Sequence, residues 1–144
     1  EQALKIYEAV GKTFSGPYTY GILALVSDDP ETRRKSFAEA ERLLKEGCVG
    51  HNYFWFYRDA IDACLKAEEW DEAERFALAL ENFARDEPTP WSDFRIDRCR
   101  ALTAVGRGAR EEGIKATLLR LRDEAQRIDL WSGLPEIEAA LAKF

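Results

Sequence analysis

The sequence predicts an all-α protein, an α-solenoid built from about three antiparallel helix pairs and a C-terminal capping helix. Apolar residues recur at helical spacing through most of the 144 residues, and glycine and proline interrupt this pattern at regular intervals. The interrupted segments also repeat. First helices are expected to begin near residues 17, 53 and 91, which are 36 and 38 residues apart, and second helices near residues 31, 71 and 109, which are 40 and 38 residues apart.

The clearest helix pair is predicted at residues 51–88, with a turn at residues 68–71. Its first helix carries apolar residues over most of its circumference, which is typical of a helix in the middle of a stack. Its second helix has a single apolar face, formed by Ala73, Phe76, Ala77, Leu80, Phe83 and Ala84. We therefore place this hairpin at the centre of the fold.

A second pair is predicted before the central hairpin, at residues 16–26 and 31–46. Asp29 is expected to cap the later helix, because Pro30 follows it and suits the first helical position. Gly47 is expected to end that helix as a C-cap glycine.

A third pair is predicted after the central hairpin. Prolines at positions 88 and 90 cannot continue a helix, because each lacks a backbone donor and restricts the residue before it. The helices of this pair and the capping helix are expected at residues 91–105, 109–128 and 134–144, with a glycine-containing turn at residues 106–108.

Composition excludes several classes of protein. The net charge of −6 and the pI of about 5.0 argue against a general nucleic-acid surface or an anionic-membrane surface. No apolar run approaches the roughly 18 residues of a membrane span. Three cysteines and one histidine suggest neither a disulfide framework nor a zinc site, so we expect reduced thiols, no metal and no cofactor in a cytoplasmic protein.

The start of the chain suggests a piece of a longer protein. It begins at Glu1, contains no methionine and carries acids where a signal peptide carries bases. We expect residues 1–144 to be a single domain of a longer multidomain protein. A short helix at residues 1–10, with Leu4, Tyr7 and Val10 apolar, would then lack its covering hairpin and would offer a surface for self-association.

The central hairpin resembles the tetratricopeptide repeat. The phrase WDEA at residues 70–73, followed by Ala77 and Leu80, stands where that family keeps its entry into the second helix and its later small and apolar positions. Ala60-Ile61 replace the family's usual Leu-Gly pair, and Cys64 replaces its tyrosine. The resemblance implies a divergent, right-handed tetratricopeptide-like solenoid without the family's recognisable peptide-carboxylate clamp.

A longer resemblance covers residues 39–143, including EAERLLKEGCVGHNYFWFYRDAIDACLKAEEWDEAERFALALENFARDEPTPWSDFRIDRCRALTAVGRG and LPEIEAALAKF. These phrases are similar to the C-terminal helical-repeat region of bacterial adenylate or guanylate cyclases, in which a class III cyclase domain and an AAA-type ATPase domain precede the repeats. The resemblance implies a regulatory or docking module. The chain contains neither paired cyclase aspartates in context nor a phosphate-binding glycine loop, so we predict no catalytic activity for it.

The function predicted is protein–protein interaction within a bacterial signalling protein, with a protein or peptide bound in a concave groove lined by the first helices. Tryptophan and arginine are favoured anchors in such interfaces. The partner-binding residues predicted are His51, Trp55, Arg58, Asp62, Trp91, Arg95 and Arg98. Other domains of the parent chain are also candidate partners.

Structural roles remain open for the same residues. A neighbouring hairpin would cover Trp55, and Trp91 would seat its helix after the proline-rich turn. His51 and Asn52 would have a capping or hydrogen-bonding role, with Asn52 well placed to cap the central helix. The arginines at 95–100 and 120–127 would form a self-compensated face with nearby acids. Small-molecule sensing near residues 53–57 and a self-association spacer are the alternative functions.

Overall fold

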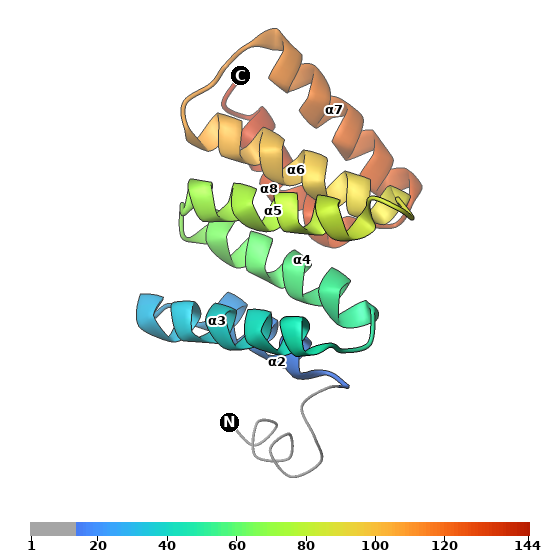
Figure 1. Ribbon diagram of the computed structural model, residues 1–144. Coiled ribbons are helices and arrows are strands. Elements are labelled where there is room, and N and C mark those ends of the chain that lie inside the picture. Colours follow the sequence, from blue (N-terminus) through green and yellow to red (C-terminus); the bar gives the residue numbers. More distant parts are fainter. Residues whose placement is uncertain (1–13) are drawn as a thin grey trace. The chain divides into compact units, whose positions relative to one another are not determined.

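The computed structural model describes residues 14–144, which contain seven α-helices, one short 3-10 helix and no strand (Figure 1). The all-α class is therefore confirmed, and the helix predicted at residues 1–10 lies outside the described residues. The elements are α2 (Gly16–Val26), α3 (Pro30–Glu46), α4 (His51–Lys66), α5 (Trp70–Ala84), α6 (Pro90–Gly106), α7 (Glu112–Arg127), η1 (Trp131–Gly133) and α8 (Leu134–Leu141).

The predicted signals at the ends of α3 are confirmed. The Asp29 side chain accepts hydrogen bonds from the backbone N–H groups of Glu31 and Thr32, and Pro30 occupies the first helical position. The hydroxyl of Thr32 also donates to Asp29, which lowers the pKa of that carboxyl. Gly47 ends the helix at φ +96°, a left-handed conformation that glycine adopts without steric cost.

Three other helices are also followed by a residue with positive φ, and only one of these residues is glycine. Gly108 follows α6 at φ +96°, whereas Glu68 follows α4 and Asp129 follows α7 at φ +57°. In each turn the next N–H reaches back five residues, from Glu69 to the carbonyl of Cys64, from Ala109 to Ala104 and from Leu130 to Ala125. These are Schellman motifs, and the sequence pattern did not reveal the two built on acidic residues.

The contacts divide the chain into two compact units, and the boundary falls inside α4 between Ala63 and Cys64. In the first unit α2 packs on α3, and Phe37 of α3 meets Phe56 of α4 edge to face, with ring centroids 6.4 Å apart. Gly21 lets α2 approach α4 closely, because a Cβ there would lie 3.2 Å from the Cβ of Asp59. A small residue therefore sets the spacing of these helices.

The second unit contains α5 to α8, and α6 packs against α5, α7 and α8 (Figure 1). Buried apolar side chains of α6, α7 and α8 form one core: Phe94, Ala101, Leu102, Val105, Leu118, Leu121, Ala125, Ile137 and Ala140. The helix predicted at residues 134–144 is thus observed as α8, and it packs on α6 and α7.

The N-terminus of α5 and the C-terminus of α6 are joined by a tight apolar contact. The ring of Trp70 lies over Gly106, where an added Cβ would be 2.6 Å from two ring carbons. Beside it, Arg107 forms an ion pair with Asp71. Trp70 and Asp71, which mark the start of α5 in the sequence, therefore contact Gly106 and Arg107 at the C-terminal end of α6.

We expect Gly106→Ala to lower the free energy of unfolding by about 1 to 3 kcal/mol, because the new methyl overpacks the site against the Trp70 ring. Urea unfolding followed by circular dichroism measures the change. Gly113→Ala is the matched control, since a Cβ at Gly113 meets nothing within 4 Å. It should be neutral or stabilising by up to about 1 kcal/mol, and an equal loss at both glycines would contradict the Trp70 contact.

We expect Glu68→Gly to raise the free energy of unfolding by up to about 1 kcal/mol. A left-handed conformation costs an L-residue roughly 1 to 2 kcal/mol, and the flexibility of glycine in the unfolded chain offsets part of that gain. Glu68→Gln removes the charge and keeps the backbone strain. An equal gain in stability from this control would show that charge, not backbone geometry, limits stability there.

Candidate interaction surface on α2 and α4

Four of the predicted partner-binding residues lie on one face of α4. His51, Trp55, Arg58 and Asp62 follow one another at spacings of four, three and four residues, which places them in register along a helix. The side chain of Trp55 is 40% exposed, and the other three residues are half-buried. All four residues are therefore at least partly exposed to solvent.

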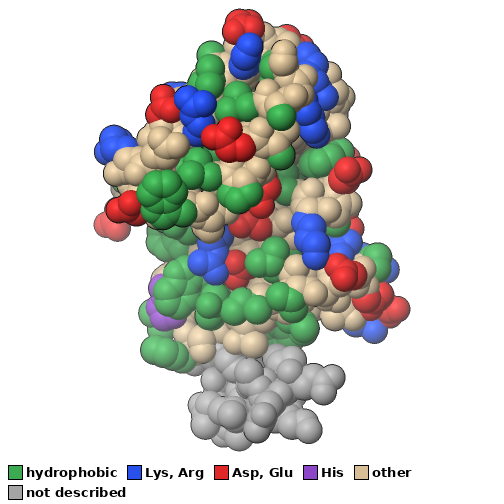
Figure 2. Space-filling model, turned by 180° about the vertical axis from the view of Figure 1, so that it is seen from behind, with side chains coloured by type: hydrophobic (Ala, Val, Ile, Leu, Met, Phe, Trp, Pro, Cys, Tyr) green, Lys and Arg blue, Asp and Glu red, His purple; other side chains and the backbone are tan. Residues whose placement is uncertain are grey.

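An aromatic surface continues from this row onto α2. Ring centroids are 5.6 Å apart for Phe14 and His51, 4.7 Å for His51 and Trp55, and 4.9 Å for Trp55 and Tyr18. We call these four residues the α2/α4 aromatic face. In Figure 2, hydrophobic side chains lie on either side of the histidine. Trp55 is therefore supported from α2 while its outer side remains accessible.

Apolar residues of α2, and Phe14 just before it, were not among the predicted partner-binding residues. Phe14, Tyr18, Ile22 and Val26 follow at four-residue spacing, and Phe14, Ile22 and Val26 are 69%, 38% and 66% exposed. This exposed stripe was visible as a period in the sequence. Its meaning was not, because an apolar stripe on a predicted helix is normally assigned to the core.

An ion pair between half-buried Arg58 and buried Asp59 supports the aromatic face at Tyr18. The Nε atom of Arg58 donates to Asp59 at 2.7 Å, and the guanidinium carbon lies 6.0 Å from the centroid of the Tyr18 ring. Burial opposes the charge of Arg58, but the hydrogen bond and negative charge of Asp59 outweigh it and raise the pKa of Arg58. Because Asp59 is only 2% exposed, the pair fixes the ring of Tyr18 rather than offering a free charge.

Asn52 anchors the end of the aromatic face. Its side-chain amide donates to the backbone carbonyls of Phe14 at 2.9 Å and Val49 at 3.1 Å. The predicted hydrogen-bonding role is therefore present, but Asn52 lies within the first turn of α4 and donates, whereas a cap residue precedes the helix and accepts. This correction explains how Phe14 is held beside His51.

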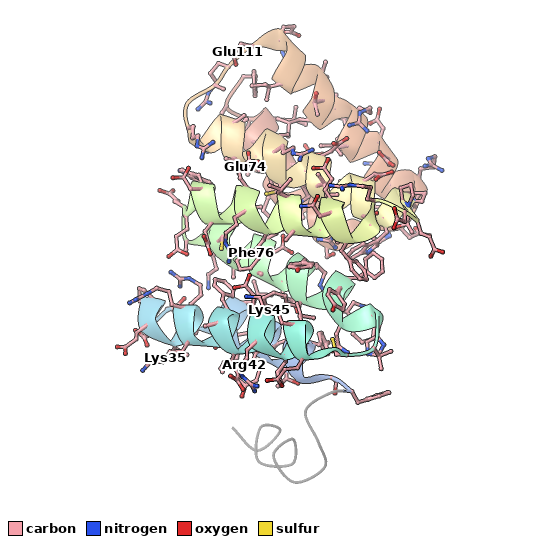
Figure 3. The ribbon with its side chains drawn as sticks, in the orientation of Figure 1. Lys35, Arg42, Lys45, Glu74, Phe76 and Glu111 are labelled. Atoms are coloured by element: carbon pink, nitrogen blue, oxygen red, sulfur yellow. The ribbon has the colours of Figure 1, made fainter. Side chains whose placement is uncertain are left out.

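The outer face of α3 has the opposite character. Lys35, Arg42 and Lys45 are spaced along this helix (Figure 3). Lys35 pairs with Glu31, and Arg42 pairs with Glu39 and Glu46, all within the helix and all exposed to solvent to some degree. Such pairs are a solvated charged surface worth little to stability. This face provides control positions in the same unit.

The structure places the three remaining predicted residues in the second unit. The Arg95 guanidinium lies 5.5 Å from the centroid of Trp91, and its Nη2 atom lies 3.3 Å from the hydroxyl of Ser132. Trp91 is half-buried, and Arg95 is 4% exposed. Arg95 is thus directed toward the C-terminal segment rather than toward solvent.

Arg98 also holds the C-terminal segment. Its Nε donates to the carbonyl oxygen of Gly133 at 3.1 Å, and its Nη2 donates to Glu136 at 2.9 Å. Its side chain is 2% exposed, and Gly133 packs against both Phe94 and Arg98. We therefore leave Arg95 and Arg98 out of the surface that we propose below.

Among residues 14–144, no group of three or more histidine, cysteine, aspartate or glutamate side chains is placed to hold a metal ion. Cys48, Cys64 and Cys99 form no disulfide within residues 14–144. No helix in the described part of the chain combines the length and apolar composition that crossing a membrane requires. Comparisons with protein-family models, curated proteins and solved structures found no match.

We expect Arg98→Ala to lower the free energy of unfolding by about 2 to 3 kcal/mol, because it leaves the buried Gly133 carbonyl without a charged donor. Arg98→Lys should recover only part of this loss, since lysine lacks the forked geometry that serves both acceptors. Glu136→Gln should cost less than about 1 kcal/mol, because Glu136 is 54% exposed. Thermal unfolding and limited proteolysis at residues 128–134 measure these effects. An Arg98→Ala protein with unchanged stability and unchanged proteolysis would show that Arg98 does not hold the C-terminal segment.

Proposed function

We propose that the helix pairs are tetratricopeptide-like repeats and that the chain is a non-catalytic protein–protein interaction module. The α2/α4 aromatic face is the surface that we assign to the partner. The carrying observation is the combination of Trp55 at 40% exposure with Phe14 at 69% exposure on a framework fixed by Arg58 and Asp59. Spacings just under forty residues and the WDEA phrase support the repeat assignment.

Physical reasons favour a protein partner for this surface. Exposed apolar side chains are ordinary when single, but contiguous apolar patches mark interaction sites. Trp55 and Tyr18 are already held by ring contacts, so binding would immobilise few further rotamers. Aromatic residues with supported positions are the usual energetic centres of interfaces. Arg58 contributes by holding Tyr18, and Asp62 extends the same α4 face.

We propose further that the parent protein is a bacterial cyclase-like signalling protein, in which this module docks a regulator or another domain of the same chain. The resemblance of residues 39–143 to the repeat region of adenylate or guanylate cyclases supports this assignment. The sequence of the complete gene tests it. A class III cyclase domain or an AAA-type ATPase domain upstream would support the proposal, and unrelated flanking domains would contradict it.

A photo-cross-linking experiment tests the interaction surface. Benzoylphenylalanine is placed at position 55 in the native cells, and the cross-linked protein is identified by mass spectrometry and purified. We expect Trp55→Ala and Tyr18→Ala each to weaken binding of this partner by about 2 kcal/mol, or roughly 30-fold, as for truncation of interface anchors. Calorimetry measures the affinities, and thermal unfolding checks that both variants fold.

Arg42→Gln on α3 is the matched control, because Arg42 is a 46%-exposed residue of the same unit and, among residues 14–144, pairs only with acids of its own helix. It should change the affinity by less than about 0.5 kcal/mol. A cross-link solely to a second copy would replace the proposal with self-association through this face. Unchanged affinity in both aromatic variants would contradict the surface assignment.

A further inference from the structure

A second surface, within the α5–α8 unit, is a groove of about 830 Å³ formed by α5, the loop after it, α6 and α7. Its volume is in the range of sites that hold small ligands or short peptide segments. Four arginines and four acidic residues line it. The groove belongs to one compact unit, so its geometry depends only on the packing of these helices.

Two of the four arginines that line the groove, Arg100 and Arg120, are already in ion pairs. Arg100 of α6 makes a two-pronged contact with Glu81 of α5, at 3.1 and 2.7 Å. Arg120 of α7 bonds to Asp97 of α6 at 2.5 Å and to Glu124 at 3.2 Å. These bonds link α6 to α5, α7 to α6 and two turns of α7. The positive charges of Arg100 and Arg120 are thus compensated by nearby acids, as expected for these arginines. These charges are therefore not available to a ligand without breaking an existing pair.

The other two arginines that line the groove have different surroundings. Within residues 14–144, neither Arg85 nor Arg127 forms an ion pair, and both side chains are exposed. Arg85 bonds instead to the neutral amide of Asn82, which orients the guanidinium without neutralising it. Its charge reaches the groove: the pKa of Glu81 is lowered first by the hydrogen bond from Arg100 and more weakly by Arg85.

The negative charge of Asp93, the remaining acid of the groove, is stabilised by its own helix. Asp93 lies in the first turn of α6, where the helix N-terminus stabilises a negative charge. Leu78 adds an apolar wall, since it lines the groove and is 51% exposed. The free binding groups are thus two forked cationic side chains beside an apolar side chain.

We infer that this groove binds an acidic peptide segment of a partner protein in an extended conformation, with carboxylates on Arg85 and Arg127 and an apolar side chain against Leu78. Guanidinium groups donate paired hydrogen bonds that match carboxylate geometry. The occupant is a peptide because a chain of alternating acidic and apolar residues satisfies all three groups at once, whereas a small anion satisfies only the arginines. This site is separate from the α2/α4 aromatic face.

Fluorescence polarisation with rhodamine-labelled peptides tests the inference on the full chain. The probe is an eight-residue peptide of alternating glutamate and leucine, and its matched control replaces each glutamate with glutamine. We expect the glutamine peptide to bind about tenfold more weakly or not at all, and Arg85→Gln and Arg127→Gln each to weaken the acidic peptide by about three- to tenfold.

Two arginines outside the groove serve as matched controls. Arg75 lies on α5 and pairs with Glu72, and Arg122 lies on α7 and pairs with Asp123. Arg75→Gln and Arg122→Gln should leave the affinity within about twofold, because they remove the same charge from the same helices elsewhere. Trp55→Ala should leave it unchanged as well, which separates this site from the aromatic face.

Several outcomes overturn the inference. Equal binding of the glutamine peptide would show that only apolar contact operates, and equal loss in the Arg75 and Arg122 controls would show a general effect of charge. Displacement of the probe by free succinate at the same concentration as the unlabelled peptide would assign the arginines to small anions. Unchanged affinity in folded Arg85→Gln and Arg127→Gln proteins would place the peptide elsewhere.

Discussion

The packing of α6 against its neighbours is the constraint on which the second unit depends, and glycine makes it possible at one end. Trp70 of α5 occupies the space that a side chain at Gly106 would fill, with ring carbons 2.6 Å from the position of a Cβ. This contact brings the two helix ends together and aligns Asp71 with Arg107. Cys99 donates to the Ala73 carbonyl farther along the same pair, at 3.4 Å. Dense interiors transmit such constraints because their side chains have little free volume.

A polar contact joins α6 to the C-terminal segment. Arg98 is almost completely buried, yet its guanidinium bonds the Gly133 carbonyl and Glu136 of the C-terminal segment. A buried charge is tolerated only when its donors are matched by acceptors, so this arrangement specifies where η1 and α8 lie. In the first unit, the ion pair of Arg58 and Asp59 likewise holds the ring of Tyr18. In both units a paired arginine positions an element that apolar packing alone would leave less defined.

The two proposed surfaces differ in chemistry and therefore in the partners they suit. The α2/α4 aromatic face offers supported rings and few free charges, which favours an apolar anchor from a folded partner. Of the four arginines in the groove on α5–α7, two form no ion pair within residues 14–144 and two are paired, which favours an acidic extended segment. A module with both surfaces has separate means of recognition.

The sequence alone determined the helices and most of their ends. Periodicity, Asp29 before Pro30 and Gly47 after α3 are local signals, and the observed helix bounds follow them closely. It also placed His51, Trp55, Arg58 and Asp62 on one face, because helical register is local as well. Tertiary structure alone decided that Arg98 is buried and holds the C-terminal segment, and that Tyr18 supports Trp55. The acceptors of Arg98 lie 35 and 38 residues away, and Tyr18 and Trp55 belong to different helices. Contacts between residues so far apart along the chain are set by packing, which periodicity does not encode.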